Sequence, residues 1–288
     1  MSRDVITDEV WELIQDVFPP VRTRGRPPVD RRTVVEATAW RFRTGSAWRD
    51  LPERFGNWNT IYKNFRRWAS DGVWEDLLTQ VQKRAALAGE IDWVVSVDSS
   101  IARVHQHGAT LTRATGGRVE LQEIRARASC DHAIGRSRGG LTTKIHLVCD
   151  GQARALAFVL TGGQVADTSM FTDVLDEIHV PGRGRARSRP DRVLADKGYP
   201  SKKNRAWLRE RGIKATIPER ADQIANRHRR PGRPIDFGDE QQERYKGRNV
   251  VERCFNFVKQ WRGLASRYDK TARSYAAGLC LSAALQWI

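Results

Sequence analysis

The stretch WVVSVDSS, from Trp93 to Ser100, is a short apolar and β-branched run that ends in an aspartate. Such a run is typical of a buried strand. Two further runs, TTKIHLVC (142–149) and RALAFVL (154–160), flank the turn dipeptide Asp150-Gly151 and predict a hairpin. A fourth strand is expected at DRVLA (191–195), which is also followed directly by an aspartate.

Helical patterns alternate with the later strands. We expect a capped helix at 167–178, a helix at about 201–211, a fifth strand at 214–217 and a long helix at about 242–262. A mixed-sheet α/β domain of ribonuclease H-like type has this order of elements: three strands, helix, strand, helix, strand and helix. The sequence therefore predicts this fold for residues 91–288.

Two aspartates define a candidate site in this domain. Asp98 and Asp196 each directly follow an apolar run, and functional groups of open α/β sheets gather beyond the carboxyl ends of strands. A site that holds two Mg²⁺ ions needs hard oxygen ligands from at least three acids. We therefore expect the third acid on a helix that faces the strand ends.

The long helix offers that acid. At about 100° per residue, Tyr245, Arg248, Glu252 and Lys259 share one narrow polar face of the helix. Such a face is often only solvated, but its position after two aspartates at strand ends favours a functional role.

Residues 1–90 predict a separate, small helical domain. Helices are expected at about 7–18, 30–43 and 59–70, with a glycine-containing turn before the last. The third helix directs three basic side chains outward, which are Lys63, Arg66 and Arg67. This order is typical of a helix-turn-helix, although a plain three-helix bundle with a solvated basic face has the same pattern.

Two other basic features are candidate DNA contacts. The segment RGRPP (24–28) is extended by its prolines, so Arg26 is expected either in a minor groove or in a basic linker. Lys144 alternates with His146 on a predicted strand and is expected to point toward a DNA phosphate.

Composition narrows the classes of protein. The 288 residues carry 50 Lys and Arg against 34 Asp and Glu, a net charge of +16 that indicates a polyanionic partner, nucleic acid first. The start MSRDVITDEVWELI lacks the features of a signal peptide, and the longest weakly polar run, 275–288, is too short to span a bilayer and predicts a buried terminal helix. The four cysteines form no CxxC pair, so we expect reduced thiols in a cytoplasmic protein.

Four separated motifs resemble one family. The signature YKGRNVVERCFNFVK (245–259) is similar to that of bacterial insertion-sequence transposases of the DDE class, and VVSVDSS, GRSRGGLTTKIH (135–146) and VLADKGYPS (193–201) match the same family around its aspartates. RGRPP and TGSAWRDLPERFGNWNTIYKNFRRW (44–68) resemble the insertion-sequence-five group.

The resemblance implies roles for individual residues. Asp98, Asp196 and Glu252 take the places of the metal-binding triad. Tyr245, Arg248 and Lys259 match the positions that hold terminal DNA. The resemblance further implies two Mg²⁺ ions, for which Mn²⁺ can substitute.

The implied activity is that of a transposase. Such an enzyme binds the terminal inverted repeats of its element, cleaves there and joins the freed 3′ hydroxyl to target DNA, as a homodimer or a larger assembly on double-stranded DNA. Two other classes stay open on the residues alone. A ribonuclease H-like nuclease or resolvase would share the three acids, and a non-catalytic DNA-binding regulator would need only residues 1–90.

Overall fold

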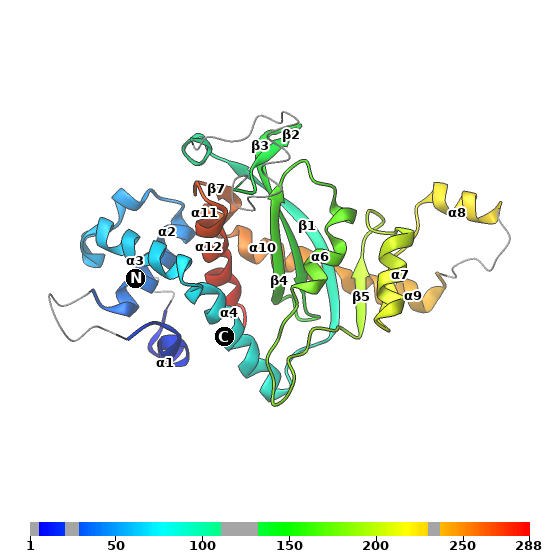
Figure 1. The fold of residues 1–288 in the computed structure, drawn as a ribbon, viewed down its shortest axis with the longest axis horizontal. Helices are drawn as coiled ribbons and strands as arrows, with labels where there is room; N and C mark the ends of the chain where they lie inside the picture. The colour runs from blue at the N-terminus through cyan, green and yellow to red at the C-terminus, as the bar shows by residue number, and fades with distance from the viewer. Residues whose placement is uncertain (1–5, 21–28, 111–131, 230–236) are drawn as a thin grey trace.

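The computed structural model describes residues 6–20, 29–110, 132–229 and 237–288. Helices from the first ninety residues lie beside a mixed β-sheet, and the last helix lies between them (Figure 1). In the part of the chain that is described, no helix is both long and apolar enough to cross a membrane.

A seven-stranded mixed sheet forms the centre of the α/β part. Its strands are β1 (Val94–Val104), β2 (Gly135–Ser137), β3 (Gly140–Cys149), β4 (Ala155–Gly162), β5 (Arg192–Ala195), β6 (Lys214–Thr216) and β7 (Ser266–Arg267). β3 pairs antiparallel with β1 along one edge and with β4 along the other, whereas β5 is parallel to both β1 and β6. This arrangement, an antiparallel three-strand unit extended by two parallel strands, confirms the predicted ribonuclease H-like fold.

β1 is longer than its apolar run. The sequence predicts that Asp98 follows the strand, but β1 continues to Val104, and Asp98 pairs with Leu147 of β3 inside it. The physical reason is the different length of the two neighbours. β5 flanks only 94–97, where both faces need apolar side chains, while β3 pairs as far as Arg103 and keeps the polar half extended.

The helices of this part follow the predicted order with one interruption. α6 (Phe171–Asp176) follows a 3₁₀ turn, and α7 (Lys202–Glu210) is capped by Ser201. The predicted long helix is divided into α9 (Asp239–Lys246) and α10 (Val250–Lys259) by a 3₁₀ turn at Gly247–Asn249. The sequence pattern did not predict α8 (Ala221–His228) or α11 (Arg262–Ala265).

The helices predicted near the N-terminus are confirmed. They are α1 (Asp8–Ile14), α2 (Arg31–Thr44) and α3 (Trp58–Ser70), followed by α4 (Val73–Ala88). Thr7 and Asp30 cap the first two with their side chains, and Gly45 ends α2 in the left-handed conformation at φ 72°. This conformation favours glycine because it has no Cβ.

The terminal helix α12 (Ala272–Ala284) is buried, as predicted, and packs against α4, α2 and α3. Its Gly278 lies against the ring of Phe42 in α2. A buried ion pair joins Arg41 of α2 to Asp269, just before α12, at 2.8 Å. The N-terminal helices therefore share a hydrophobic core with the end of the chain.

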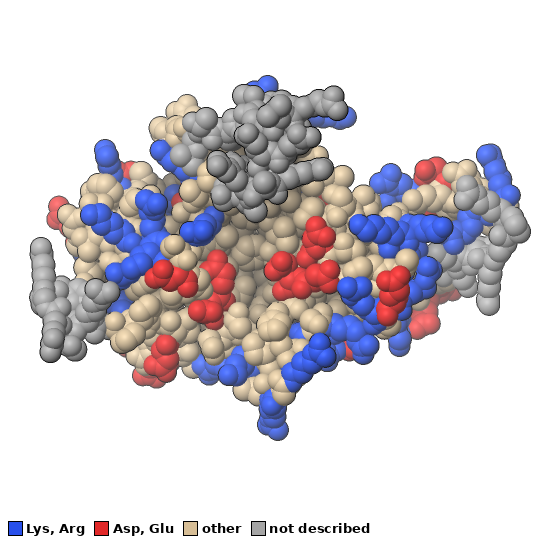
Figure 2. Space-filling model, viewed as in Figure 1, with Lys and Arg blue, Asp and Glu red and all other residues tan. Residues whose placement is uncertain are grey.

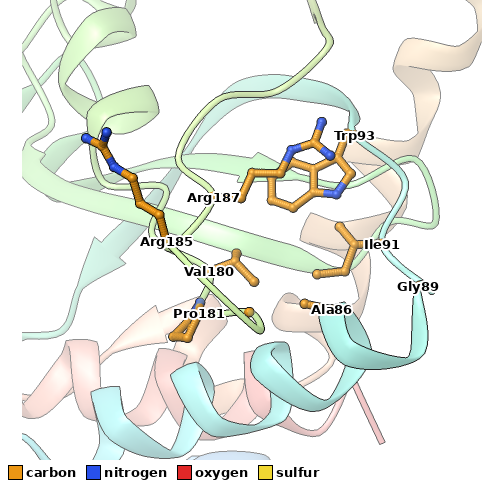
Figure 3. Close-up of a pocket in the computed structure, with 9 residues that line it drawn as sticks. Ala86, Gly89, Ile91, Trp93, Val180, Pro181, Arg185 and Arg187 are labelled. Carbon is orange, nitrogen blue, oxygen red and sulfur yellow. The ribbon is translucent and has the colours of Figure 1, made fainter.

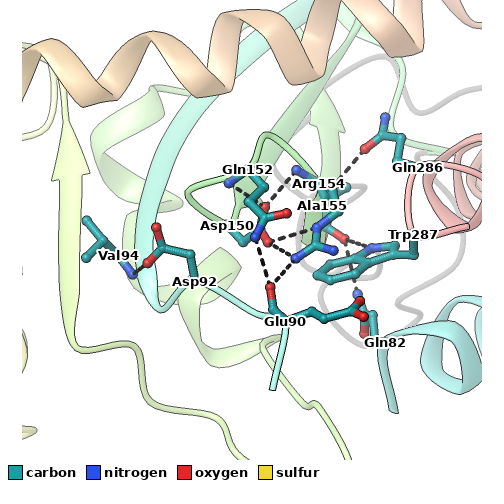
Figure 4. Close-up of polar contacts among 10 residues, drawn as sticks. All are labelled: Gln82, Glu90, Asp92, Val94, Asp150, Gln152, Arg154, Ala155, Gln286 and Trp287. Atoms are coloured by element: carbon teal, nitrogen blue, oxygen red, sulfur yellow. Dashed lines mark hydrogen bonds and ion pairs between the residues drawn. The ribbon is translucent and has the colours of Figure 1, made fainter. Parts of the chain in front are cut away.

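The turn between β3 and β4 links the sheet to this helical core (Figure 4). The buried Asp150 carboxylate accepts two hydrogen bonds from the guanidinium of Arg154, which also donates to the carbonyl of Glu90. Beside it, Gln82 of α4 and Trp287 donate to the carbonyl of Ala155. Asp150 is thus a buried structural residue as well as the predicted turn residue.

A hollow lies at the opposite end of the sheet from the end of β5 (Figure 3). Its walls are the end of α4, the segment just before β1 and the arginine-rich loop after α6. The guanidinium of Arg187 lies 4.0 Å from the ring of Trp93 and pairs with Asp191. These contacts fix the loop against the sheet.

Candidate active site

The two predicted aspartates lie next to each other. The parallel ladder pairs Val97 of β1 with Ala195 of β5, so Asp98 and Asp196 are the next residues on adjacent strands. Backbone amides orient both carboxylates. The amide of Ser99 donates to Asp98 Oδ1 at 2.8 Å, and the amide of Gly198 donates to Asp196 Oδ1 at 2.6 Å.

Glu252 reaches this point from the first turn of α10, which packs on β1 and β3. Arg248 lies between Glu252 and Asp98. Its Nη1 is 3.2 Å from Asp98 Oδ2, and its Nη2 is 2.5 Å from Glu252 Oε1. The guanidinium therefore bridges the carboxylates of Asp98 and Glu252, which are more than 150 residues apart in the chain.

The other two residues of the predicted polar face lie close by. Lys259 Nζ donates to Ser100 Oγ at 2.5 Å and to the carbonyl of Ile101 at 3.3 Å. The ring of Tyr245 lies 5.7 Å from the Arg248 guanidinium. The structure thus places Lys259 against the polar half of β1 and Tyr245 beside Arg248, although the predicted helix is divided between them.

The site concentrates negative charge in a half-buried setting. Burial raises the pKa of Asp98, and the neighbouring Asp196 and Glu252 raise it further, against the opposing effect of Arg248. Burial lowers the pKa of Lys259. A cation placed among these carboxylates would relieve their mutual repulsion.

The donor atoms suit a hard divalent cation. All three acids offer carboxylate oxygens, the ligands that Mg²⁺ prefers. Oε2 of Glu252 is buried and has no hydrogen-bond partner, which is costly for a carboxylate oxygen unless a ligand satisfies it. Within the described ranges, no three His, Cys, Asp or Glu side chains are grouped closely enough to hold an ion as they stand, and Arg248 occupies the space between two of the acids.

The basic residues of α3 lie away from this site. Lys63, Arg66 and Arg67 are exposed, while Ile61 and Phe65 on the same helix are buried, as predicted. The three basic side chains line a shallow hollow together with Asn59 and Tyr62. Arg26 lies outside the described residues.

Charge is unevenly distributed on the surface. Figure 2 shows Lys and Arg side chains over the N-terminal helices and over the region of β5 and α7, with a small acidic group near α6. Basic patches of this kind attract polyanions such as DNA.

Lys144 has a different environment from the expected one. It is only 9% exposed, and its Nζ lies 2.9 Å from Asp167 Oδ1 and 2.7 Å from the carbonyl of Val165. The expected contact with a DNA phosphate would require this ion pair to break. The lysine is held inside because β3 is covered on this face by the segment that follows β4.

Sequence reasoning missed Asp167 and Ser99 as residues near the site. Ser99 donates its hydroxyl to Asp167 Oδ1 at 2.6 Å. Asp167 was expected only as the start of a helix, because nothing in its local pattern indicates a contact 68 residues away. The adjacency of Ser99 to Asp98 was the only available signal.

Comparisons with known proteins identify the family of the chain. Residues 90–287 match the family model described as "Transposase DDE domain", and residues 6–78 match "Putative transposase of IS4/5 family". The chain is 36% identical over 121 residues to "Uncharacterized protein y4sN" of Sinorhizobium fredii, covering 41% of this chain and 92% of that protein. It is 34% identical over 152 residues to "Putative transposase for insertion sequence element IS402" of Burkholderia cepacia, covering 52% of this chain and 64% of that protein.

A solved structure, the Mos1 strand transfer complex, covers 84% of this chain and 82% of its own, with 11% identity and a TM-score of 0.26, a likeness too weak for comparing sites. The match to the transposase DDE domain spans the chain from before β1 to after α12. The chain therefore belongs to the transposase DDE domain family and is a DNA transposase.

Proposed function

We propose that Asp98, Asp196 and Glu252 together bind two Mg²⁺ ions for cleavage and joining of DNA. The observation that carries this proposal is that Asp98 and Asp196 follow paired residues of adjacent strands and that Arg248 bridges Asp98 to Glu252, whose buried Oε2 has no hydrogen-bond partner. Ions bound there would activate the attacking oxygen and stabilise the leaving oxygen of a phosphoryl transfer. Mn²⁺ is expected to substitute, since it also accepts carboxylate ligands.

Arg248, Lys259 and Tyr245 position the DNA in this proposal. Arg248 neutralises the carboxylates while DNA is absent, and its guanidinium suits bidentate binding of a phosphate. Lys259 lies on the same side of β1 and offers a second positive charge. Tyr245 stacks or donates to the terminal nucleotides.

The DNA substrate is the terminal inverted repeat of the element. α3 reads the repeat with Lys63, Arg66 and Arg67, and Arg26 contributes from the preceding segment. Hydrolysis at the repeat boundary frees a 3′ hydroxyl, which then attacks target DNA. Because two ends must be processed together, the active species is a homodimer or a larger assembly.

Cleavage of a labelled element end tests this function. The full chain with Mg²⁺ is expected to produce a 3′ nick at the repeat boundary. Asp98→Ala, Asp196→Ala and Glu252→Ala are each expected to abolish the nick while end binding, measured by gel shift, stays within about twofold, because ligands of metal ions make no base contacts.

Two results would contradict the proposal. Full cleavage activity in any of the three variants would show that the substituted acid is not a required metal ligand. Nicking by the wild type with no joining to target DNA would instead favour a nuclease or resolvase.

A further inference from the structure

A second polar cluster lies behind Asp98, on the other face of the sheet. Side chains alternate along a strand, so Asp98 and Ser100 point to the face where they meet Arg248 of the 3₁₀ turn and Lys259 of α10. Ser99 points to the opposite face, which α6 covers (Figure 1). The cluster around Ser99 is therefore separated from the DNA-facing residues by the sheet itself.

Asp167 is the centre of this cluster. Its Oδ1 accepts the Ser99 hydroxyl at 2.6 Å and pairs with Lys144 Nζ at 2.9 Å. Lys144 also donates to the carbonyl of Val165 at 2.7 Å, which anchors the segment that carries Asp167 to β3. His146 lies beside them and contacts Thr161 Oγ1 through Nε2 at 2.9 Å.

Ser99 connects the cluster to the site. Its backbone amide donates to Asp98 Oδ1, and its hydroxyl donates to Asp167. A single residue thus bonds to one carboxylate on each side of the sheet. Ser99 lies beyond Val94–Val97, the residues of β1 that pair with β5, and pairs with His146 of β3 on its other side.

The contacts of the cluster favour an ionised Asp167 carboxylate and a neutral Tyr199 phenol. Burial works against ionisation of Asp167, but the Ser99 hydroxyl and the Lys144 amine together lower its pKa. Burial, and the nearby charges of Asp98, Asp167 and Asp196, raise the pKa of the Tyr199 phenol, which stays neutral. The negative charge of Asp167 is thus balanced by Lys144 and does not add to the repulsion in the site.

We propose that Asp167 is a positioning residue for the metal site, which holds the Asp98 carboxylate in place through Ser99 and is itself held by Lys144. This inference rests on the proposed function, since it takes Asp98 as a metal ligand. Residues that orient metal ligands in this way affect metal affinity by about tenfold to a hundredfold when they are changed.

Asp167→Asn is the main test, in the full chain with element-end DNA. The amide keeps the shape of the side chain but loses the ion pair with Lys144. The matched control is Asp176→Asn on α6, a side chain on the same face of the sheet that is exposed and 3.6 Å from Arg211. For each variant we would measure the Mn²⁺ dissociation constant of the DNA complex by electron paramagnetic resonance, the Mn²⁺ dependence of nicking and the affinity for end DNA.

Asp167→Asn is expected to weaken Mn²⁺ binding about tenfold or more and to shift the nicking curve by the same factor, with end binding unchanged. Asp176→Asn is expected to match the wild type. Ser99→Ala, which removes only one hydroxyl, should shift the Mn²⁺ constant in the same direction and decides the question if Asp167→Asn does not fold.

An unchanged Mn²⁺ constant in Asp167→Asn, or in Ser99→Ala if the former does not fold, would overturn the positioning role. A wild-type complex that neither binds Mn²⁺ nor nicks the end would instead contradict the proposed function. The two failures are therefore distinguishable.

Discussion

Arg248 occupies the space between two of the proposed metal ligands, so its charge competes with a cation. Arg248→Ala removes the guanidinium that pairs with both Asp98 and Glu252. We expect the DNA-free variant to bind Mn²⁺ more tightly than the wild type, by about tenfold, since hydrogen bonds to charged groups contribute on the order of 1.5 to 3 kcal/mol. The measurement is Mn²⁺ titration by electron paramagnetic resonance.

The same variant should cleave more slowly. Loss of one phosphate contact is expected to reduce the nicking rate at saturating DNA by about tenfold to a hundredfold, and added Mg²⁺ should not restore it. Lys259→Ala is the control, because it contacts Ser100 and no carboxylate. It should slow nicking but leave Mn²⁺ affinity unchanged, and equal Mn²⁺ affinity in Arg248→Ala and wild type would refute the competition.

His146 gives the fold a measurable pH dependence. Burial lowers its pKa from 6.5 to about 4. Below pH 6.5 the unfolded chain binds the proton first, so the stabilisation present at neutral pH is lost as the pH falls toward 4, by up to about 1.4 kcal/mol per unit. Urea denaturation of wild type and His146→Gln at pH 7 and pH 5 should show a smaller loss in the variant. An equal loss of stability in both proteins would show that a group other than His146 causes the pH dependence.

At the scale of the element, α3 combines a buried stripe with an exposed basic one. Arg66→Ala and Arg67→Ala in the full chain are expected to reduce affinity for element ends about tenfold each, because contacts with phosphates or bases are lost. The slope of log affinity against log salt should fall by about 0.9 for each phosphate contact removed. Filter binding at several salt concentrations measures both quantities.

Lys83→Ala and Arg84→Ala on α4 are the controls for this helix and should change end affinity less than twofold. Equal losses from α3 and α4 variants would mean that net charge, and not the face of α3, determines binding.

The interrupted helix is a second feature at this scale. The 3₁₀ turn at Gly247–Asn249 contains Arg248 and lies directly before the turn of α10 that carries Glu252. A short 3₁₀ stretch within a helix often marks a hinge or a sequence under strain. From this turn, Arg248 pairs with one carboxylate of β1 and one of α10.

At the scale of the whole molecule, α12 joins the N-terminal helices to the end of the chain. A Cβ at Gly278 would lie 2.4 Å from the buried Phe42 ring, so Gly278→Ala must displace packed atoms. Overpacking of this kind costs about 1 to 3 kcal/mol, which should lower Tm by several degrees. The loss should be similar when unfolding is followed by helix or by sheet signals, because the two parts share a core.

Gly184→Ala is the matched control, since a Cβ there meets nothing within 4 Å. Its Tm should equal that of the wild type. An unchanged Tm in Gly278→Ala would show that the contact between α12 and α2 adjusts to the added methyl group with no loss of stability.

The sequence by itself predicted the five strands β1, β3, β4, β5 and β6, the order of most elements and the three candidate acids. Apolar runs before Asp98 and Asp196 reflect burial between flanking strands, and helix caps such as Thr7 and Asp30 are local chemistry. The polar face that carries Glu252 follows from helical periodicity. These features depend on residues that are close together in the chain, so they can be predicted from the sequence pattern.

Only the tertiary structure decided how β1 continues past Asp98, where Lys144 points and which residue stands behind the site. β1 is extended by pairing with β3, and Lys144 is held by Asp167. The packing of α12 on α2 likewise joins residues more than 200 positions apart. Such contacts form when segments far apart in the chain pack together and exclude water. The local pattern of residues does not show which distant segment will pack against it.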